Sequence, residues 1–282
     1  MAFSQIGRLG IIVVLLLSNV CFAYEREIAI TIDDLPFIGE ANNNPGKLKR
    51  EQERFMNIMQ ALVDNNVPAT GFVIAGTIEK GQWELLEQFR QAGFSLGNHT
   101  YTHISLDSTS ADKYIDNVDK ADKVLDSLMP YPRYFRYPYL AEGHGTKRQK
   151  VRQYLSTHNY IIAPVTVDSK DFVFNKRLYH PYRLHEQTLK QIKPQYLAYI
   201  WHETLKAEHS RSKPILLIHA NLLNSYCMAD IIALYKRKGY RFISLDEALQ
   251  QQSAKKEKVT RSEEAAAEKI EFDQWLFPSP NL

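Results

Sequence analysis

Apolar runs of strand length alternate with longer amphipathic segments along most of the chain. The runs that predict strands are EIAITI (27–32), ATGFVIA (69–75), FSLGN (94–98), YFRYP (134–138), IIAPVTV (161–167), PILLIHA (214–220) and YRFISL (240–245). Apolar residues at helical spacing predict helices near 48–65, 82–93, 111–129, 147–159, 186–208 and 228–239. Strands that are each followed by a helix indicate a parallel sheet with both faces covered.

Seven strand–helix units are compatible with an open doubly wound sheet or with a closed, slightly irregular barrel. Residues 24–250 contain no internal repeat and no linker, so we expect a single α/β domain, and 282 residues are an ordinary length for one α/β barrel. Residues 251–282 are charged and have only a thin apolar face, which predicts a partly helical or loose tail.

The first 23 residues have the layout of a secretory signal peptide. Arg8 precedes the apolar run LGIIVVLLL, and a short polar end closes at Ala23, where we expect cleavage. The apolar run is too short to span a bilayer comfortably, so no stable membrane span is expected after cleavage, with an uncleaved anchor as the alternative. The sequence therefore predicts a secreted or periplasmic protein in which Cys227 is the sole remaining cysteine and no intramolecular disulfide forms.

Charge and composition narrow the classes of partner. Lys and Arg total 35 against 32 Asp and Glu, a formal net charge of +3, which is too small to indicate a nucleic-acid partner. A hydrophobic content of 44% is enough for a sizeable core. The composition leaves the oligomeric state open.

Polar residues that can do chemistry follow five of the predicted strands. They are Asp33 and Asp34, His99 and His103, Arg136 and Tyr139, Asp168 and Asp171, and His219. Taken singly, an acid pair is usually a turn, a histidine after an apolar run is usually a core residue, and a lone acid belongs to a loop. Because ligands of parallel α/β folds bind outside the carboxyl ends of the strands, the joint pattern predicts one functional site.

The order and spacing of these residues resemble the polysaccharide deacetylase family, also called the NodB-homology or carbohydrate esterase family 4 proteins. TIDDLP is similar to the family motif T-F-D-D-G-P, HTYTH to H-[ST]-x-x-H, RYPY to R-x-P-Y, VDSKDF to D-x-x-D-W, and LIH to L-x-H. The resemblance covers roughly residues 27–250, nearly the whole chain that would remain after cleavage. It implies a distorted (β/α)7 TIM-like barrel, which agrees with the seven predicted strands.

The resemblance also implies a catalytic metal site. Asp34, His99 and His103 would be the ligands of a divalent metal, with zinc expected first and cobalt or nickel as alternatives. Asp33 would be the general base that activates water, and Arg136 would be the cation that holds it. Adjacent carboxylates repel each other, so the two acids need different partners.

The remaining roles implied by the resemblance concern the leaving group and the acetyl group. His219 would be the general acid that protonates the departing amine, and Asp171 would keep its imidazole charged and aligned. The backbone N–H of Tyr139 would stabilise the developing oxyanion, and Leu217 would line the acetyl pocket.

Three positions depart from the family pattern. Leu35 stands where Gly is usual, Ile104 where Pro or Ser commonly follows the second histidine, and Phe172 where Trp is usual. None of them removes a metal ligand or an acid–base group. We therefore expect activity, with the sugar preference open.

The sequence thus predicts a metal-dependent hydrolase that removes N-acetyl groups from a glycan such as peptidoglycan, a chitin-like polymer or poly-N-acetylglucosamine. The alternatives are an O-acetyl esterase or small-amide hydrolase on the same scaffold, and a catalytically silent glycan-binding protein. Segments 37–47 and 172–187 are expected to border the cleft, with sugar-gripping candidates Asn43, Asn44, Tyr179, Tyr182 and Arg183.

Overall fold

The computed structural model describes residues 26–37, 44–79, 81–129, 131–178, 185–209 and 213–250. The expected signal peptide and the 251–282 tail lie outside these ranges, as do the sugar-gripping candidates Asn43, Tyr179, Tyr182 and Arg183. None of the helices in the described ranges combines the length and the hydropathy that a membrane span requires.

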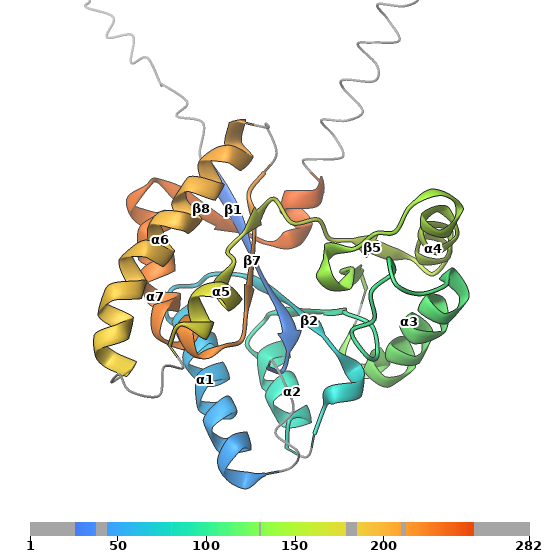
Figure 1. Cartoon of the computed structure of the whole chain (residues 1–282), viewed down its shortest axis with the longest axis horizontal. Coiled ribbons are helices and arrows are strands. Elements are labelled where there is room, and N and C mark those ends of the chain that lie inside the picture. Colours follow the sequence, from blue (N-terminus) through green and yellow to red (C-terminus); the bar gives the residue numbers. More distant parts are fainter. Residues whose placement is uncertain are drawn as a thin grey trace, which may run out of the picture.

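A curled sheet of parallel strands forms the centre of the molecule (Figure 1). Its strands are β1 (Arg26–Leu35), β2 (Ala69–Val73), β3 (Ser95–Asn98), β4 (Arg133–Phe135), β5 (Tyr160–Ile162), β6 (Val167–Asp168), β7 (Ile215–His219) and β8 (Tyr240–Ile243). Their order is β5-β4-β3-β2-β1-β7-β6, and β8 pairs with the start of β1. β1 is buried along nearly its whole length, as expected for a strand covered on both faces.

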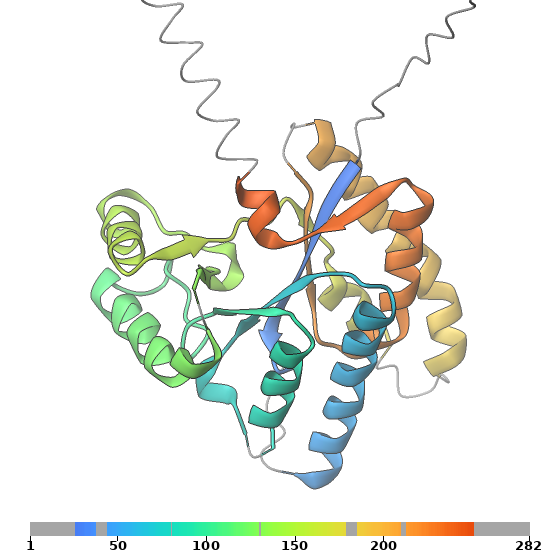
Figure 2. The same cartoon turned by 180° about the vertical axis from the view of Figure 1, so that it is seen from behind.

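Helices surround this sheet in both views (Figures 1 and 2). They are α1 (Pro45–Asp64), α2 (Trp83–Gln91), α3 (Ala111–Leu125), α4 (Gly145–Thr157), α5 (Asp171–Lys176), α6 (His185–His209) and α7 (Leu222–Arg237), with short 3-10 helices η1 (Ala75–Thr77), η2 (Asp126–Leu128) and η3 (Pro138–Leu140). α1 shows the common pattern, since its buried Phe55, Ile58, Met59 and Leu62 recur at helical spacing. The predicted α/β architecture is confirmed.

The fifth predicted strand, 161–167, is divided in the structure into β5 and β6. β5 pairs with β4, whereas β6 pairs with β7, so the sheet has eight described strands instead of the seven predicted. The break falls at Pro164, which has no N–H to give to a strand ladder. The carbonyl oxygens of Ala163 and Pro164 are thereby available to bind the side chain of Arg136.

α7 begins at Leu222, six residues before the predicted helix start at 228. Asn221 caps it, because its side-chain oxygen accepts the backbone N–H of Asn224 at 3.0 Å. The helix therefore starts almost directly after β7 and places Asn224 in its first turn, close to His219.

The register of the sheet brings the predicted site residues to one edge. β1 lies between β2 and β7, and Asp33 is the register partner of His219. Asn98, just before His99, is the partner of Val73 on one side and Phe135 on the other. Because all these pairs are parallel, the residues after β1, β3, β4 and β7 emerge at the same side of the sheet.

Candidate active site

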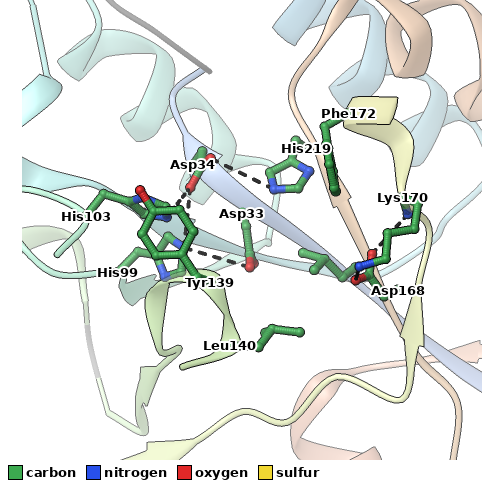
Figure 3. A pocket seen from close by; sticks show the side chains of 11 residues that line it. Asp33, Asp34, His99, His103, Tyr139, Leu140, Asp168, Lys170, Phe172 and His219 are labelled. Atoms are coloured by element: carbon green, nitrogen blue, oxygen red, sulfur yellow. Dashed lines mark hydrogen bonds and ion pairs between the residues drawn. The ribbon is translucent and has the colours of Figure 1, made fainter. Parts of the chain in front are cut away.

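A pocket of about 400 Å³ opens at this carboxyl edge (Figure 3). It is lined by Asp33, Asp34, His99, His103, Tyr139, Leu140, Asp168, Lys170, Phe172, Leu217 and His219. Its volume lies within the range of ordinary small-molecule sites. Seven of the nine predicted site residues thus share one cavity, and the other two, Arg136 and Asp171, are fully buried behind its wall.

The Asp34 carboxylate faces two imidazoles. Its Oδ1 lies 3.3 Å from Nε2 of His99 and 3.2 Å from Nε2 of His103. Nδ1 of His99 lies 2.8 Å from the carbonyl oxygen of Arg136. Because a carbonyl oxygen only accepts, Nδ1 carries a proton, and in the neutral ring Nε2 presents a lone pair towards Asp34.

This trio fits a metal ion. One ligand atom from each of Asp34, His99 and His103 lies within 4.8 Å of the others. The buried Oδ1 of Asp34 has no hydrogen-bond donor in the described structure, although both Nε2 atoms are close to it. Lone pairs that face each other at such distances repel unless a proton or cation lies between them, and two imidazoles with a carboxylate are the ligands of many catalytic zinc sites.

The electrostatics of Asp34 favour its charged form. Burial by itself raises the pKa of this carboxyl, but the contacts from His103 and His99 outweigh it and leave the pKa far below its usual range. Asp34 and His103 also have left-handed backbones, with φ of 60° and 55°. Non-glycine residues adopt such values only where the surrounding structure holds them, as at functional sites.

Asp33 occupies a different environment from its neighbour. It is 3% exposed and accepts a hydrogen bond from Nη1 of Arg136 at 3.0 Å. Arg136 also donates to Thr31 Oγ1 at 2.9 Å, and its guanidinium lies 4.4 Å from the centre of the Phe72 ring. With two carbonyl oxygens from the β5–β6 break as further acceptors, this arginine is held rigidly and fixes the Asp33 carboxylate.

His219 lies on the other side of the Asp34 carboxylate from His99 and His103 (Figure 3). Its Nδ1 is 2.7 Å from Oδ1 of Asp171, and its Nε2 is 3.9 Å from Oδ2 of Asp34. Burial alone would lower the pKa of His219, but the charge and hydrogen bond of Asp171, together with the charges of Asp34 and Asp33, outweigh it and raise the pKa to about 9. Asp171 is the first residue of α5, so the helix directly after β6 supplies the partner of a histidine on β7.

Tyr139, Phe172 and Leu217 form walls of the pocket. Tyr139 has a φ of 57° and packs its ring edge-on to His103 with centroids 4.4 Å apart. Phe172, at the position where the resemblance expects Trp, is half exposed and stands edge-on to His219 at 6.5 Å. Leu217 is nearly buried on β7. The oxyanion role of the Tyr139 N–H stays a prediction.

Leu35 and Ile104 also differ from the family pattern. Leu35 is a fully buried residue of β1. Its side chain fills the space beside Gly71 on β2, where an added Cβ would lie 2.2 Å from it. Leu35 thus acts in the core rather than in the cavity. Ile104 packs against the apolar cluster around Leu106 and Tyr114, also outside the pocket lining.

Sequence reasoning missed several residues. Leu140 and Lys170 line the pocket, and Lys170 forms an ion pair with Asp168 at 2.6 Å. Asn224, fully buried, donates to Asp171. No spacing in the sequence marks Asn224, and the only available signal is its place three residues after Asn221, a residue type that begins helices.

Comparison with known proteins agrees with the fold and the motifs. The model of the polysaccharide deacetylase family matches residues 23–161, and the chain belongs to this family. A peptidoglycan-N-acetylglucosamine deacetylase of Bacillus cereus is 27% identical over 149 residues, which are 52% of this chain and 47% of that protein. The chain thus spans about half the length of this relative.

Two solved structures are similar in fold to this chain. A chitin deacetylase of Colletotrichum lindemuthianum is 27% identical over 232 residues, 79% of each chain, and its structure superposes with a TM-score of 0.56 at 22% identity over 79% of this chain and 86% of that one. A carbohydrate esterase family 4 pseudoenzyme from Bacillus anthracis superposes with a TM-score of 0.58 at 18% identity over 80% and 66%. The predicted distorted (β/α)7 barrel in a single domain is confirmed.

Proposed function

We propose that this protein is a metal-dependent hydrolase that removes N-acetyl groups from a glycan outside the cytoplasm. The observation that carries the proposal is the grouping of three units around one pocket. These are the Asp34–His99–His103 trio, the Asp33–Arg136 pair and the His219–Asp171 pair. Relatives named as peptidoglycan and chitin deacetylases support a polymer of N-acetylated sugars as substrate.

Asp34, His99 and His103 would hold the cation. When bound, a divalent ion there supplies Lewis acidity towards the acetyl carbonyl and the attacking water, and zinc is proposed first because two imidazoles and a carboxylate suit it, with cobalt or nickel as alternatives. Oδ2 of Asp33 lies 3.9 Å from Nε2 of His99, which supports the inference that this carboxylate would take a proton from a water molecule beside the trio. Arg136 holds Asp33 in that orientation.

The remaining residues of the pocket would complete the reaction. An amine is a poor leaving group until its nitrogen is protonated, and His219 keeps a proton at neutral pH because of Asp171. Nε2 of His219 would give that proton to the departing nitrogen. The N–H of Tyr139 would donate to the carbonyl oxygen as it becomes negative, and Leu217 would contact the acetyl methyl group.

Acetate release tests this function. The mature chain is expected to release acetate from N-acetylglucosamine oligomers and not from acetylated xylan, to lose this activity with a chelator, and to regain it with zinc or cobalt. Release from acetylated xylan alone would favour an esterase instead. Glycan binding without release would favour a silent glycan-binding protein, a possibility raised by the pseudoenzyme among the similar structures.

The raised pKa of His219 predicts a pH dependence. The rate is expected to fall as the pH rises through about 9, because the imidazole then loses the proton that it must donate. Asp171→Asn removes the largest of the charges that raise this pKa, while the burial that lowers it remains, so the fall should move to lower pH, as measured by kcat against pH. Asp168→Asn, whose carboxylate pairs with Lys170, should leave the midpoint in place. An unmoved midpoint in Asp171→Asn would contradict the role of Asp171.

A further inference from the structure

A chain of buried hydrogen bonds runs behind His219 and has no part in the mechanism above. Asn224 on α7 and Tyr196 on α6 are both fully buried. The hydroxyl of Tyr196 donates to Oδ1 of Asn224 at 2.7 Å, and Nδ2 of Asn224 donates to Oδ2 of Asp171 at 2.5 Å. This series of hydrogen bonds thus reaches the Asp171 carboxylate, which binds His219.

Asn224 contacts both halves of the His219 unit. Besides its bond to Asp171, its Nδ2 donates to the backbone carbonyl oxygen of His219 at 2.9 Å. Asp171 in turn accepts from the backbone N–H of His219 at 2.6 Å and lies 2.7 Å from its Nδ1. The side-chain amide of Asn224 therefore bridges the backbone of His219 and the Asp171 carboxylate that orients its ring.

The orientation of this amide is fixed by its partners. A carboxylate and a carbonyl oxygen only accept, so the NH₂ group must face Asp171 and His219, and the amide oxygen must face Tyr196. The backbone N–H of Asn224 is held by Asn221 in the first turn of α7. Every polar atom of the side chain is satisfied in a buried setting, where such networks are most rigid.

We propose that Asn224 is a positioning residue for the His219–Asp171 pair, with Tyr196 setting the orientation of its amide. Asn224 keeps the Asp171 carboxylate pointed at Nδ1, so that Nε2 of His219 faces the pocket. Asn224 is therefore expected to affect the turnover of substrates whose leaving group must be protonated. The inference rests on the proposed N-deacetylation, because that reaction gives His219 a nitrogen to protonate.

The test compares two substrates with different leaving groups. In Asn224→Leu, kcat for acetate release from an N-acetylglucosamine oligomer is expected to fall about 10–100-fold, with KM and metal content unchanged. Hydrolysis of 4-nitrophenyl acetate should stay within about twofold, because nitrophenolate departs without a proton. Asn224→Asp should behave like Asn224→Leu or worse, since it sets two carboxylates against each other.

Tyr196→Phe and Tyr235→Phe form a matched pair that keeps the volume of the core. Tyr235 lies on the same helix as Asn224, is fully buried, and shares a hydrogen bond of 2.7 Å with Thr204 on α6, away from Asp171. We expect Tyr196→Phe to lower amide turnover selectively and Tyr235→Phe to leave the ratio of amide to ester turnover unchanged. If Asn224→Leu does not fold, this pair of variants still tests whether the network positions His219.

Equal losses on both substrates, or no loss in either Asn224→Leu or Tyr196→Phe, would overturn the inference and reduce the network to packing. These outcomes are distinct from failure of the proposed function. A wild-type protein that releases no acetate from N-acetylated glycans contradicts the function itself, whereas an active wild type with unaffected variants contradicts only the role of Asn224.

Discussion

Replacing Asp33 by asparagine is expected to reduce acetate release by about 10²–10⁴-fold, the usual contribution of a general base. Asparagine has nearly the same shape, and its side-chain oxygen can still accept the hydrogen bond from Arg136, so the geometry of the site should persist. What it cannot do is take a proton from water. The measurement is kcat on an N-acetylglucosamine oligomer beside the metal content of the purified protein, which should stay at about one ion per chain.

The neighbouring acid provides the matched control. Asp34→Asn replaces the carboxylate that faces His99 and His103 by a neutral amide. This variant should therefore lose both bound metal and activity. Asp33→Asn should lose activity alone. Full activity in Asp33→Asn would remove Asp33 as the base, and a loss of metal in that variant would mean that Asp33 helps to assemble the metal site instead.

Arg136→Met is expected to lower the free energy of unfolding by about 3–5 kcal/mol, because it leaves the buried charge of Asp33 without its partner. The wild-type side chain donates to Thr31, Asp33 and two carbonyl oxygens, all from within the core. Denaturation in urea measures the change. Arg148→Met is the surface control, since its ion pair with Glu142 is solvent-exposed and should contribute at most about 1 kcal/mol.

A double variant separates charge from packing. If the cost of Arg136→Met comes from an unpaired carboxylate, adding Asp33→Asn should restore part of the stability, because the buried charge is then gone. If the cost comes from the lost contacts with Phe72 and the β5–β6 break, the second change should restore nothing. The latter result would contradict the assignment of Arg136 as the counter-charge of Asp33.

Asp34, His99 and His103 show how much of a candidate site can be predicted from local sequence pattern. Asp34 follows an apolar strand, and His99 and His103 follow another, so their place at the carboxyl edge could be predicted from the spacing of the strands. The convergence of their side chains on one point depends on the left-handed backbones of Asp34 and His103, which no periodicity encodes. The roles assigned to these residues stay predictions until the variants are measured.

The error at 161–167 has a local cause that could have been weighed. Pro164 cannot donate to a ladder, so a strand through it was unfavourable. That β5 joins β4 while β6 joins β7 could not be foreseen, because partner choice depends on the path of the whole sheet. The early start of α7 similarly rested on Asn221, whose capping contact forms once the chain turns after β7.

By itself, the sequence determined the alternation of strands and helices, the membership of the deacetylase family and the residues that crowd the ends of the strands. These follow from hydrophobic periodicity and from short motifs, both of which are local properties of the chain. Only the tertiary structure decided that Arg136 also binds two carbonyl oxygens at the β5–β6 break, that Asn224 meets Asp171 across 53 positions, and that Lys170 and Leu140 line the pocket. Such contacts are set by how elements pack and by which buried polar groups need partners, and spacing along the chain carries no record of either.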